Sequence, residues 1–236
     1  MRDYLLDIVQ HTHGLGVINL IKISGTSDST SINAFDQVTK TVVLNAEFKN
    51  PLPDFIGTFG MPNLDRLNTI IGIPEYKEDA KITVTQRANA QGTNEPDGIH
   101  FENKDGDFRN DYRFMNQEII NEKMKTVKFR GVKWDVEIEP SVAAVQRFNF
   151  QAQANNEHTT FLAKTDGDKL KFTFGDQSTH GGEFIFATDV KGNLNKGWTW
   201  PVAPILAILK IADVNNTKMS FSNEVGAVMI TLDSGI

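Results

Sequence analysis

Apolar residues recur at helical spacing in four stretches of the chain. In the first, Leu5, Leu6, Ile8 and Val9 form the apolar side of a helix that Gly14 would end. The second begins at one proline and ends before another, and the third and fourth repeat the same spacing of apolar side chains. The four predicted helices cover residues 2–13, 62–73, 140–154 and 202–212.

Many of the remaining apolar residues alternate with polar ones, which predicts strands. Asp-Gly turns at 105–106 and 166–167 separate neighbouring runs, as in hairpins. The predicted strands cover residues 17–24, 32–37, 42–48, 81–86, 98–103, 108–115, 134–138, 159–164, 170–174, 183–190, 218–223 and 226–232, with a short extended piece at 198–201. Helices and strands mixed in this way predict an α+β fold.

One stretch of the chain, residues 41–67, repeats at residues 183–209, shifted by 142 positions without a gap. Residues 41–48, which form a predicted strand, align with residues 183–190, and Pro62 aligns with Pro204. Each copy is a strand, a loop with glycine and aromatic residues, and a helix. A constant offset of this kind indicates a duplicated unit.

The duplication predicts two pseudo-symmetric domains, each with two helices packed on an antiparallel sheet. We expect the first domain to cover residues 1–115 and the second to cover residues 132–236. Residues 116–131 are charged and weakly patterned, so they are the predicted connector. At 236 residues the chain is long enough for two domains that each bury a core.

Composition narrows the functional classes. The chain has no cysteine, which excludes disulfides, thiolate catalysis and cysteine-based metal sites. No apolar run reaches the roughly 18 residues of a membrane span, and Asp3 and Asp7 argue against a signal peptide. We therefore expect a soluble, cytoplasmic protein. The net charge of −6 argues against nucleic-acid binding unless the cations gather on one face.

The candidate sites for chemistry are weak. His11 and His13 flank opposite sides of a helix end, and no third ligand stands at a supporting spacing. The acidic turns at 105–111 and 166–168 lack the glutamate that closes a calcium loop. No phosphate-binding, dinucleotide-binding or nucleophile-elbow motif occurs. We therefore expect no catalytic residue, no metal and no cofactor.

Each predicted helix carries a cation on its polar side. These four residues are Arg2, Arg66, Arg147 and Lys210. Every one of these helices also contains or adjoins an acid, and a charged helix face is usually just solvated. Charge alone therefore does not assign them a partner.

The helix-entry segments at 59–67 and 200–209, with the strand-to-helix segment at 137–145, resemble those of the sliding clamps. These are the DNA polymerase processivity factors of the PCNA type, and the likeness is greatest to the short clamps of T4-like bacteriophages. The resemblance implies a homotrimeric ring with helices inside and sheets outside. Such a ring encircles duplex DNA without sequence preference, in the host bacterial cytoplasm when it is phage-encoded, and has no chemistry of its own.

The resemblance also implies partners and contacts. Arg2, Arg66, Arg147 and Lys210 would face the DNA phosphates. A tail peptide of the replicative polymerase, and the clamp loader, would dock in an apolar pocket on the outer face near the connector. Subunits would pair strand 111–115 of one chain with strand 183–188 of the next.

Two departures from the family pattern concern the ends of the domains. The chain opens directly on a helix, whereas strand 134–138 precedes the equivalent helix in the second half. The second half stops where the first half continues with strand 108–115. Either the sequence is trimmed at its ends, or sheet completion and ring closure differ from the family.

Two other functions fit the same pattern. A virion structural or assembly protein could be built from duplicated α+β domains and would assemble without DNA. A small-molecule enzyme could hold its site between the two halves.

Overall fold

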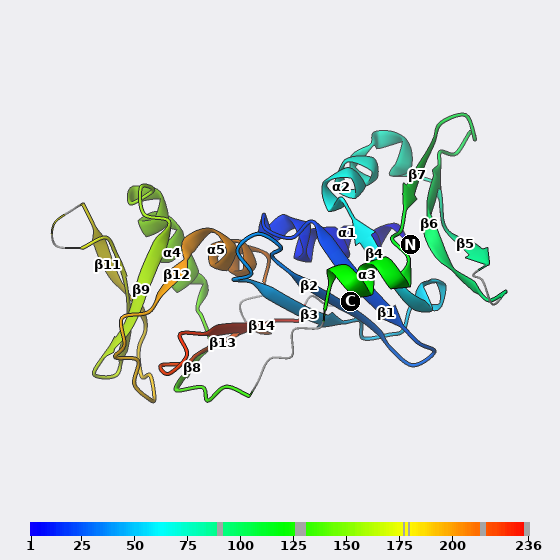
Figure 1. The fold of residues 1–236 in the computed structure, drawn as a ribbon. Helices are drawn as coiled ribbons and strands as arrows, with labels where there is room; N and C mark the ends of the chain where they lie inside the picture. Colours follow the sequence, from blue (N-terminus) through cyan, green and yellow to red (C-terminus); the bar gives the residue numbers. More distant parts are fainter. Residues whose placement is uncertain (89–91, 126–130, 177, 179, 213–215, 234–236) are drawn as a thin grey trace. The chain divides into compact units, whose positions relative to one another are not determined.

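The computed structural model describes residues 1–88, 92–125, 131–176, 178, 180–212 and 216–233. The chain divides into two compact units, Met1–Val127 and Lys128–Gly235. The described residues form five α-helices and 14 strands, and all strand pairs are antiparallel (Figure 1). The predicted α+β class is confirmed.

The first sheet of unit 1 has the strand order β3-β2-β1-β4. Ile23 of β1 pairs with Ile32 on one side and with Phe59 on the other, and all three are buried. Lys22 points to the opposite face, as the period of a strand requires. The bounds are β1 (Leu20–Gly25), β2 (Thr30–Phe35), β3 (Val43–Glu47) and β4 (Gly57–Pro62).

Helices α1 (Arg2–His11) and α2 (Leu64–Gly72) pack against each other in unit 1. Helix α2 buries its predicted apolar stripe, and Leu67 is fully enclosed. Helix α1 buries Leu5, Ile8 and Val9, whereas Leu6 is half-buried. A short 3₁₀ turn, His13–Leu15, follows α1. The second predicted helix began at Pro62, but the chain is still in β4 there, because residues 57–62 pair with β1.

The second sheet of unit 1 has the order β5-β6-β7, with β5 (Lys81–Ala88), β6 (Asn94–Glu102) and β7 (Arg109–Arg113). Phe101 and Tyr112 face the core, and the Tyr112 hydroxyl donates to the carbonyl oxygen of Pro62. This bond ties the second sheet to the first, and burial raises the pKa of Tyr112.

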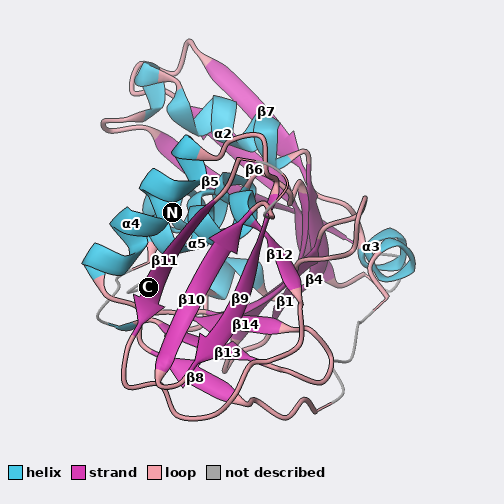
Figure 2. Ribbon diagram, turned by 90° about the vertical axis from the view of Figure 1, so that its left-hand side faces the viewer, coloured by secondary structure: helices cyan, strands magenta, loops and turns pink. Residues whose placement is uncertain are grey.

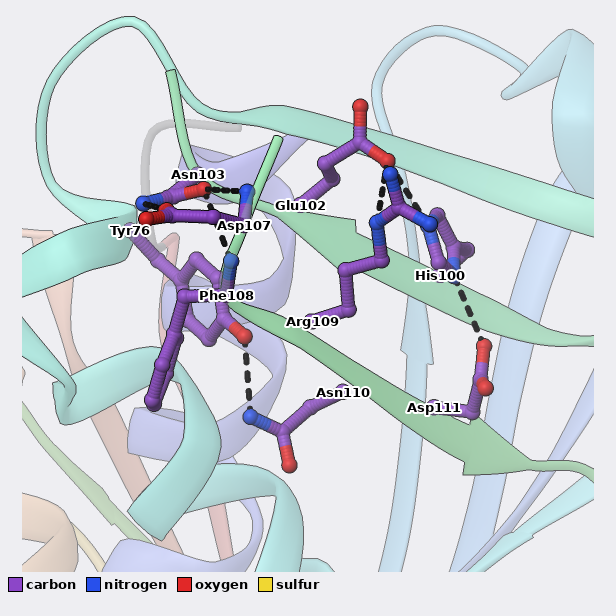
Figure 3. Close-up of polar contacts among 9 residues, drawn as sticks. All are labelled: Tyr76, His100, Glu102, Asn103, Asp107, Phe108, Arg109, Asn110 and Asp111. Atoms are coloured by element: carbon purple, nitrogen blue, oxygen red, sulfur yellow. Dashed lines mark hydrogen bonds and ion pairs between the residues drawn. The ribbon is translucent and has the colours of Figure 1, made fainter. Parts of the chain in front are cut away.

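The outward face of this sheet carries a chain of polar contacts (Figure 3). The Nδ1 atom of His100 lies 2.8 Å from an Asp111 carboxylate oxygen. Arg109 Nε lies 2.8 Å from the carboxylate of Glu102 across the same strand pair. At the turn, the Asn103 side chain accepts hydrogen bonds from the N–H groups of Asp107 and Phe108. The Asp107 carboxylate in turn accepts a hydrogen bond from the Asn103 amide at 2.8 Å, so it helps to hold the turn.

Helix α3 (Gln117–Lys123) lies in the segment expected to be a patternless connector. Asn116 caps it by accepting the N–H of Ile119 at 3.0 Å. Ile120 is fully buried against Gly60, where an added Cβ would lie 2.7 Å from the Ile120 Cδ1 atom. Gly60 also exchanges two 2.8 Å backbone hydrogen bonds with Met115. The first part of the segment is thus anchored to β4, and residues 126–130 lie outside the described ranges.

Unit 2 repeats this plan. Its first sheet has the order β11-β10-β9-β12, which is the order of unit 1 with equivalent strands in equivalent places (Figure 2). One helix precedes the first strand and another follows the fourth in both units. The bounds are α4 (Val142–Ala154), β9 (Thr160–Asp166), β10 (Lys169–Phe174), β11 (Gly182–Ala187), β12 (Thr199–Pro201) and α5 (Val202–Ile211).

The core of unit 2 is aromatic. The Phe148 ring of α4 lies 4.9 Å from the Phe161 ring and 5.4 Å from the Phe172 ring, and it is fully buried. Trp200 packs near Phe221 at the far side of this cluster, 5.6 Å away between ring centroids. These rings fill the space between the helices and the sheet.

The second sheets of the two units are completed differently. In unit 2 the order is β14-β13-β8, so β8 (Val136–Ile138), which precedes α4, pairs with β13 (Lys218–Phe221). In unit 1, no described strand precedes α1, and β7 is added beside β6 instead. No described strand follows β14 (Val228–Thr231). Among the described residues, the second sheets of the two units therefore differ in the strand that completes them.

Candidate nucleic-acid-facing helices

Two pairs of helices carry the cations that the sequence singled out. The pair α1–α2 packs together in unit 1, and the pair α4–α5 packs together in unit 2. The structure places Arg2 on α1, Arg66 on α2, Arg147 on α4 and Lys210 on α5. Each unit therefore holds two of the four cations.

Arg2 is held inside unit 1. Its Nη2 atom donates to the backbone carbonyl of Ile71 at 3.4 Å, and its Nε atom is buried without a described partner. The side chain therefore satisfies a carbonyl in the last turn of α2 and joins the two helices. This arrangement leaves less of the guanidinium available to a phosphate than a fully exposed arginine offers.

Replacing Arg2 with methionine is expected to lower the free energy of unfolding by about 1 kcal/mol, because the hydrogen bond to the Ile71 carbonyl is removed while the aliphatic stem remains. Urea denaturation measures the change, with the exposed Arg66→Met as the matched control. Equal destabilisation by the two substitutions would mean that the contact of Arg2 with Ile71 does not stabilise unit 1.

Arg66 and Lys210 are exposed, and neither forms an ion pair within the described part of the chain. Arg66 follows Asp65, which is also exposed and lies 3.7 Å from the ring of His13. Lys210 stands in the last turn of α5, where a cation is favoured by the helix dipole.

Arg147 is exposed as well, but its guanidinium carbon lies 5.6 Å from the centre of the Phe184 ring. Phe184 belongs to β11, so the stacking contact holds Arg147 against that strand. A stacked guanidinium keeps its charge and its N–H donors.

The histidines of unit 1 are paired with carboxylates. His11 Nδ1 lies 3.0 Å from the Asp7 side chain, and this hydrogen bond raises the pKa of His11. His13 points to Asp65. The described residues contain no group of three or more side chains of the kinds that bind metals.

A shallow hollow lies on the outward face of the first sheet of unit 1, beside the end of α3. Its floor is formed by outward residues of β1, β2 and β3, and its wall by the segment that leaves α3. The lining residues are Lys22, Asn33, Ala34, Phe35, Val43, Asn45, Met124 and Lys125. The hollow therefore combines apolar side chains with amides and two lysines.

One exposed apolar feature was not predicted from the sequence. Phe150 and Val142 of α4 are 64% and 55% exposed, although α4 also supplies Phe148 to the core. The side chains of Phe148 and Phe150 point to opposite sides of α4, because residues two positions apart in a helix differ in direction by about 200°. Their spacing could have shown that one of these two rings faces outward.

No family model matches the chain, and no curated protein matches its sequence. Solved structures do match its fold. One is the H. pylori Beta clamp in complex with 5-chloroisatin, with a TM-score of 0.62 and 13% sequence identity. The match covers 98% of this chain and 58% of that clamp chain. The chain therefore has a clamp-type fold and spans somewhat over half the length of the clamp that it matches. None of the described helices is long and apolar enough to cross a membrane.

Proposed function

We propose that this chain is a DNA sliding clamp, a processivity factor that encircles duplex DNA and tethers a replicative polymerase. The observation that carries the proposal is the duplicated topology, with one helix pair and the same strand order in each unit, together with a clamp fold over 98% of the chain. A ring made of such units needs repeated, near-equivalent pieces. The proposed function is mechanical and involves no catalysis.

The proposed ring is a homotrimer, like those of T4-like bacteriophages. Support comes from two open sheet edges, since β7 and β11 are each the last strand of their sheet. Next to β11, helix α4 exposes Phe150 and Val142. Unpaired strand edges and exposed apolar side chains are costly in a monomer, and pairing β7 with β11 of a second copy would cover them.

Charge is compatible with a sliding function. The four helices of the two pairs carry four cations and three acids, which is a formal charge of +1. Because the whole chain has a net charge of −6, the residues outside these helices have a net charge of −7. A few cations on the inner surface would attract phosphates over a distance without reading bases, which permits movement along the duplex. Negative charge elsewhere would discourage other contacts with DNA.

We place the partner peptides at the hollow beside α3. Its apolar residues Phe35, Val43 and Met124 would take apolar side chains of a polymerase tail, and Lys22 and Lys125 would take acidic ones. The clamp loader would use the same surface before the polymerase. The setting is the cytoplasm of a bacterial host.

The test is the mass in solution by light scattering over a concentration series, followed by binding to closed and cut circular DNA. We expect a species of three chains that stays on closed circles and slides off cut ones, with salt-sensitive binding. A DNA-indifferent assembly would favour a virion protein instead. A strict monomer without DNA binding would overturn the clamp proposal.

A further inference from the structure

The helix pairs of the two units differ in charge. Helices α1 and α2 together hold three acids and two cations, a formal charge of −1 with neutral histidines. Helices α4 and α5 hold two cations and no acid, a formal charge of +2. The two units therefore share a topology but differ in the charge of their helix pairs.

The cations of the α1–α2 pair are less accessible to a phosphate than the formal charge suggests. Arg2 is bound to the Ile71 carbonyl, whereas Asp3 is exposed and has no ion pair among the described residues. The exposed Arg66 stands next to the exposed Asp65. A phosphate approaching this pair would meet a carboxylate within one residue of each cation, and repulsion would cancel most of the attraction.

Helices α4 and α5 contain no acid within their own bounds, although Glu139 precedes α4 and Glu157 follows it. Their exposed residues other than the two cations are amide, aliphatic or aromatic, such as Gln146, Gln153 and Ala203. Amide side chains can donate hydrogen bonds to phosphate oxygens, and small residues let the backbone of a duplex come close. Arg147 is held by its stacking on Phe184, and Lys210 is free to reach out.

We propose that the α4–α5 pair of unit 2 makes the phosphate contacts, and that the α1–α2 pair of unit 1 repels the duplex weakly. This inference rests on the proposed clamp function and deepens it, because it assigns the DNA contact to one half of each subunit. In a trimeric ring, attractive and weakly repelling helix pairs would then alternate. The number of phosphates neutralised is set by unit 2 alone.

The test compares one exposed cation from each helix pair, Lys210→Gln on α5 and Arg66→Gln on α2. We expect Lys210→Gln to flatten the dependence of log affinity on log salt by about one unit for each phosphate that is no longer neutralised, because each lysine bound to a phosphate releases counterions. Arg66→Gln should leave that slope unchanged. Asp3→Asn on α1 should raise the affinity at low salt by about twofold to threefold, since a repulsive charge is removed.

Closed circular DNA is the probe, and light scattering on every variant shows whether the assembly is intact. An Arg66→Gln effect equal to that of Lys210→Gln, or an Asp3→Asn variant that binds no better than the unmodified chain, would overturn the asymmetry while leaving the clamp function standing. If the unmodified chain shows no salt-sensitive binding, both the function and the inference are overturned.

Discussion

Phe148→Ala is expected to lower the free energy of unfolding of unit 2 by about 3–5 kcal/mol, the range for removing a buried aromatic ring from a core. Phe148 lies on α4, and its fully buried ring contacts the rings of Phe161 and Phe172 on the sheet. Removing it leaves a cavity between the helix and the sheet that neighbouring rings cannot fill without leaving their own packing. Urea denaturation followed by far-ultraviolet circular dichroism measures the change.

Phe150→Ala is the matched control, because it removes the same side chain two positions away in the same helix. Phe150 is 64% exposed, so we expect a cost below about 1 kcal/mol in conditions where the chain is monomeric. Equal destabilisation by the two substitutions would mean that Phe148 does not anchor the core of unit 2.

Phe150→Glu is expected to raise the dissociation concentration of the proposed trimer by at least about 30-fold. An exposed aromatic residue beside an open strand edge is the kind of residue that carries at least about 2 kcal/mol of an interface, and a carboxylate in its place would have to be desolvated. Light scattering over a dilution series measures the shift. The folded unit should be unaffected, since Phe150 lies outside the core.

Val38→Glu serves as the control for this second prediction. Val38 is 89% exposed in unit 1 and lies between β2 and β3, outside both proposed edge strands. The substitution adds the same charge in place of an exposed apolar side chain and should leave the mass unchanged. If both variants dissociate the assembly, added negative charge is the cause and Phe150 is not an interface anchor.

Most helices and strands followed from periodicity, because their apolar residues have to reach one core. Helix α4 was expected at 140–154 and spans Val142–Ala154, and strand β10 was expected at 170–174 and spans Lys169–Phe174. Strand β4 was missed. Gly57, Gly60 and Pro62 dilute its apolar pattern, although the pairing with β1 needs only the backbone and the buried Phe59 and Met61.

Helix α3 was missed for a related reason. Only Ile120 and Met124 of that region are buried among the described residues, so the segment has too few apolar residues for a clear helical pattern. Its packing depends on Gly60, which lies 60 residues earlier in the chain than Ile120 and leaves room for its side chain. Such a pair is a tertiary contact, and a single sequence does not show it.

The candidate site divides in the same way. Helical spacing placed Arg66, Arg147 and Lys210 on polar helix sides, and the structure shows all three exposed. Helical spacing also placed Arg2 on a polar helix side, but in the structure Arg2 donates a hydrogen bond to the carbonyl of Ile71 on another helix. The stacking of Arg147 on Phe184 likewise joins α4 to a strand far along the chain. Periodicity predicts the side of a helix, and partners on other elements come only with the fold.

The division into two units has a spectroscopic consequence. All three tyrosines, at positions 4, 76 and 112, belong to unit 1, and all three tryptophans, at positions 134, 198 and 200, belong to unit 2. Tryptophan emission excited at its red edge therefore reports the second unit alone, and tyrosine absorbance bands report the first. With no cysteine in the chain, one introduced thiol would also carry a dye at a single chosen place. The melting of each unit can thus be followed separately in the intact protein.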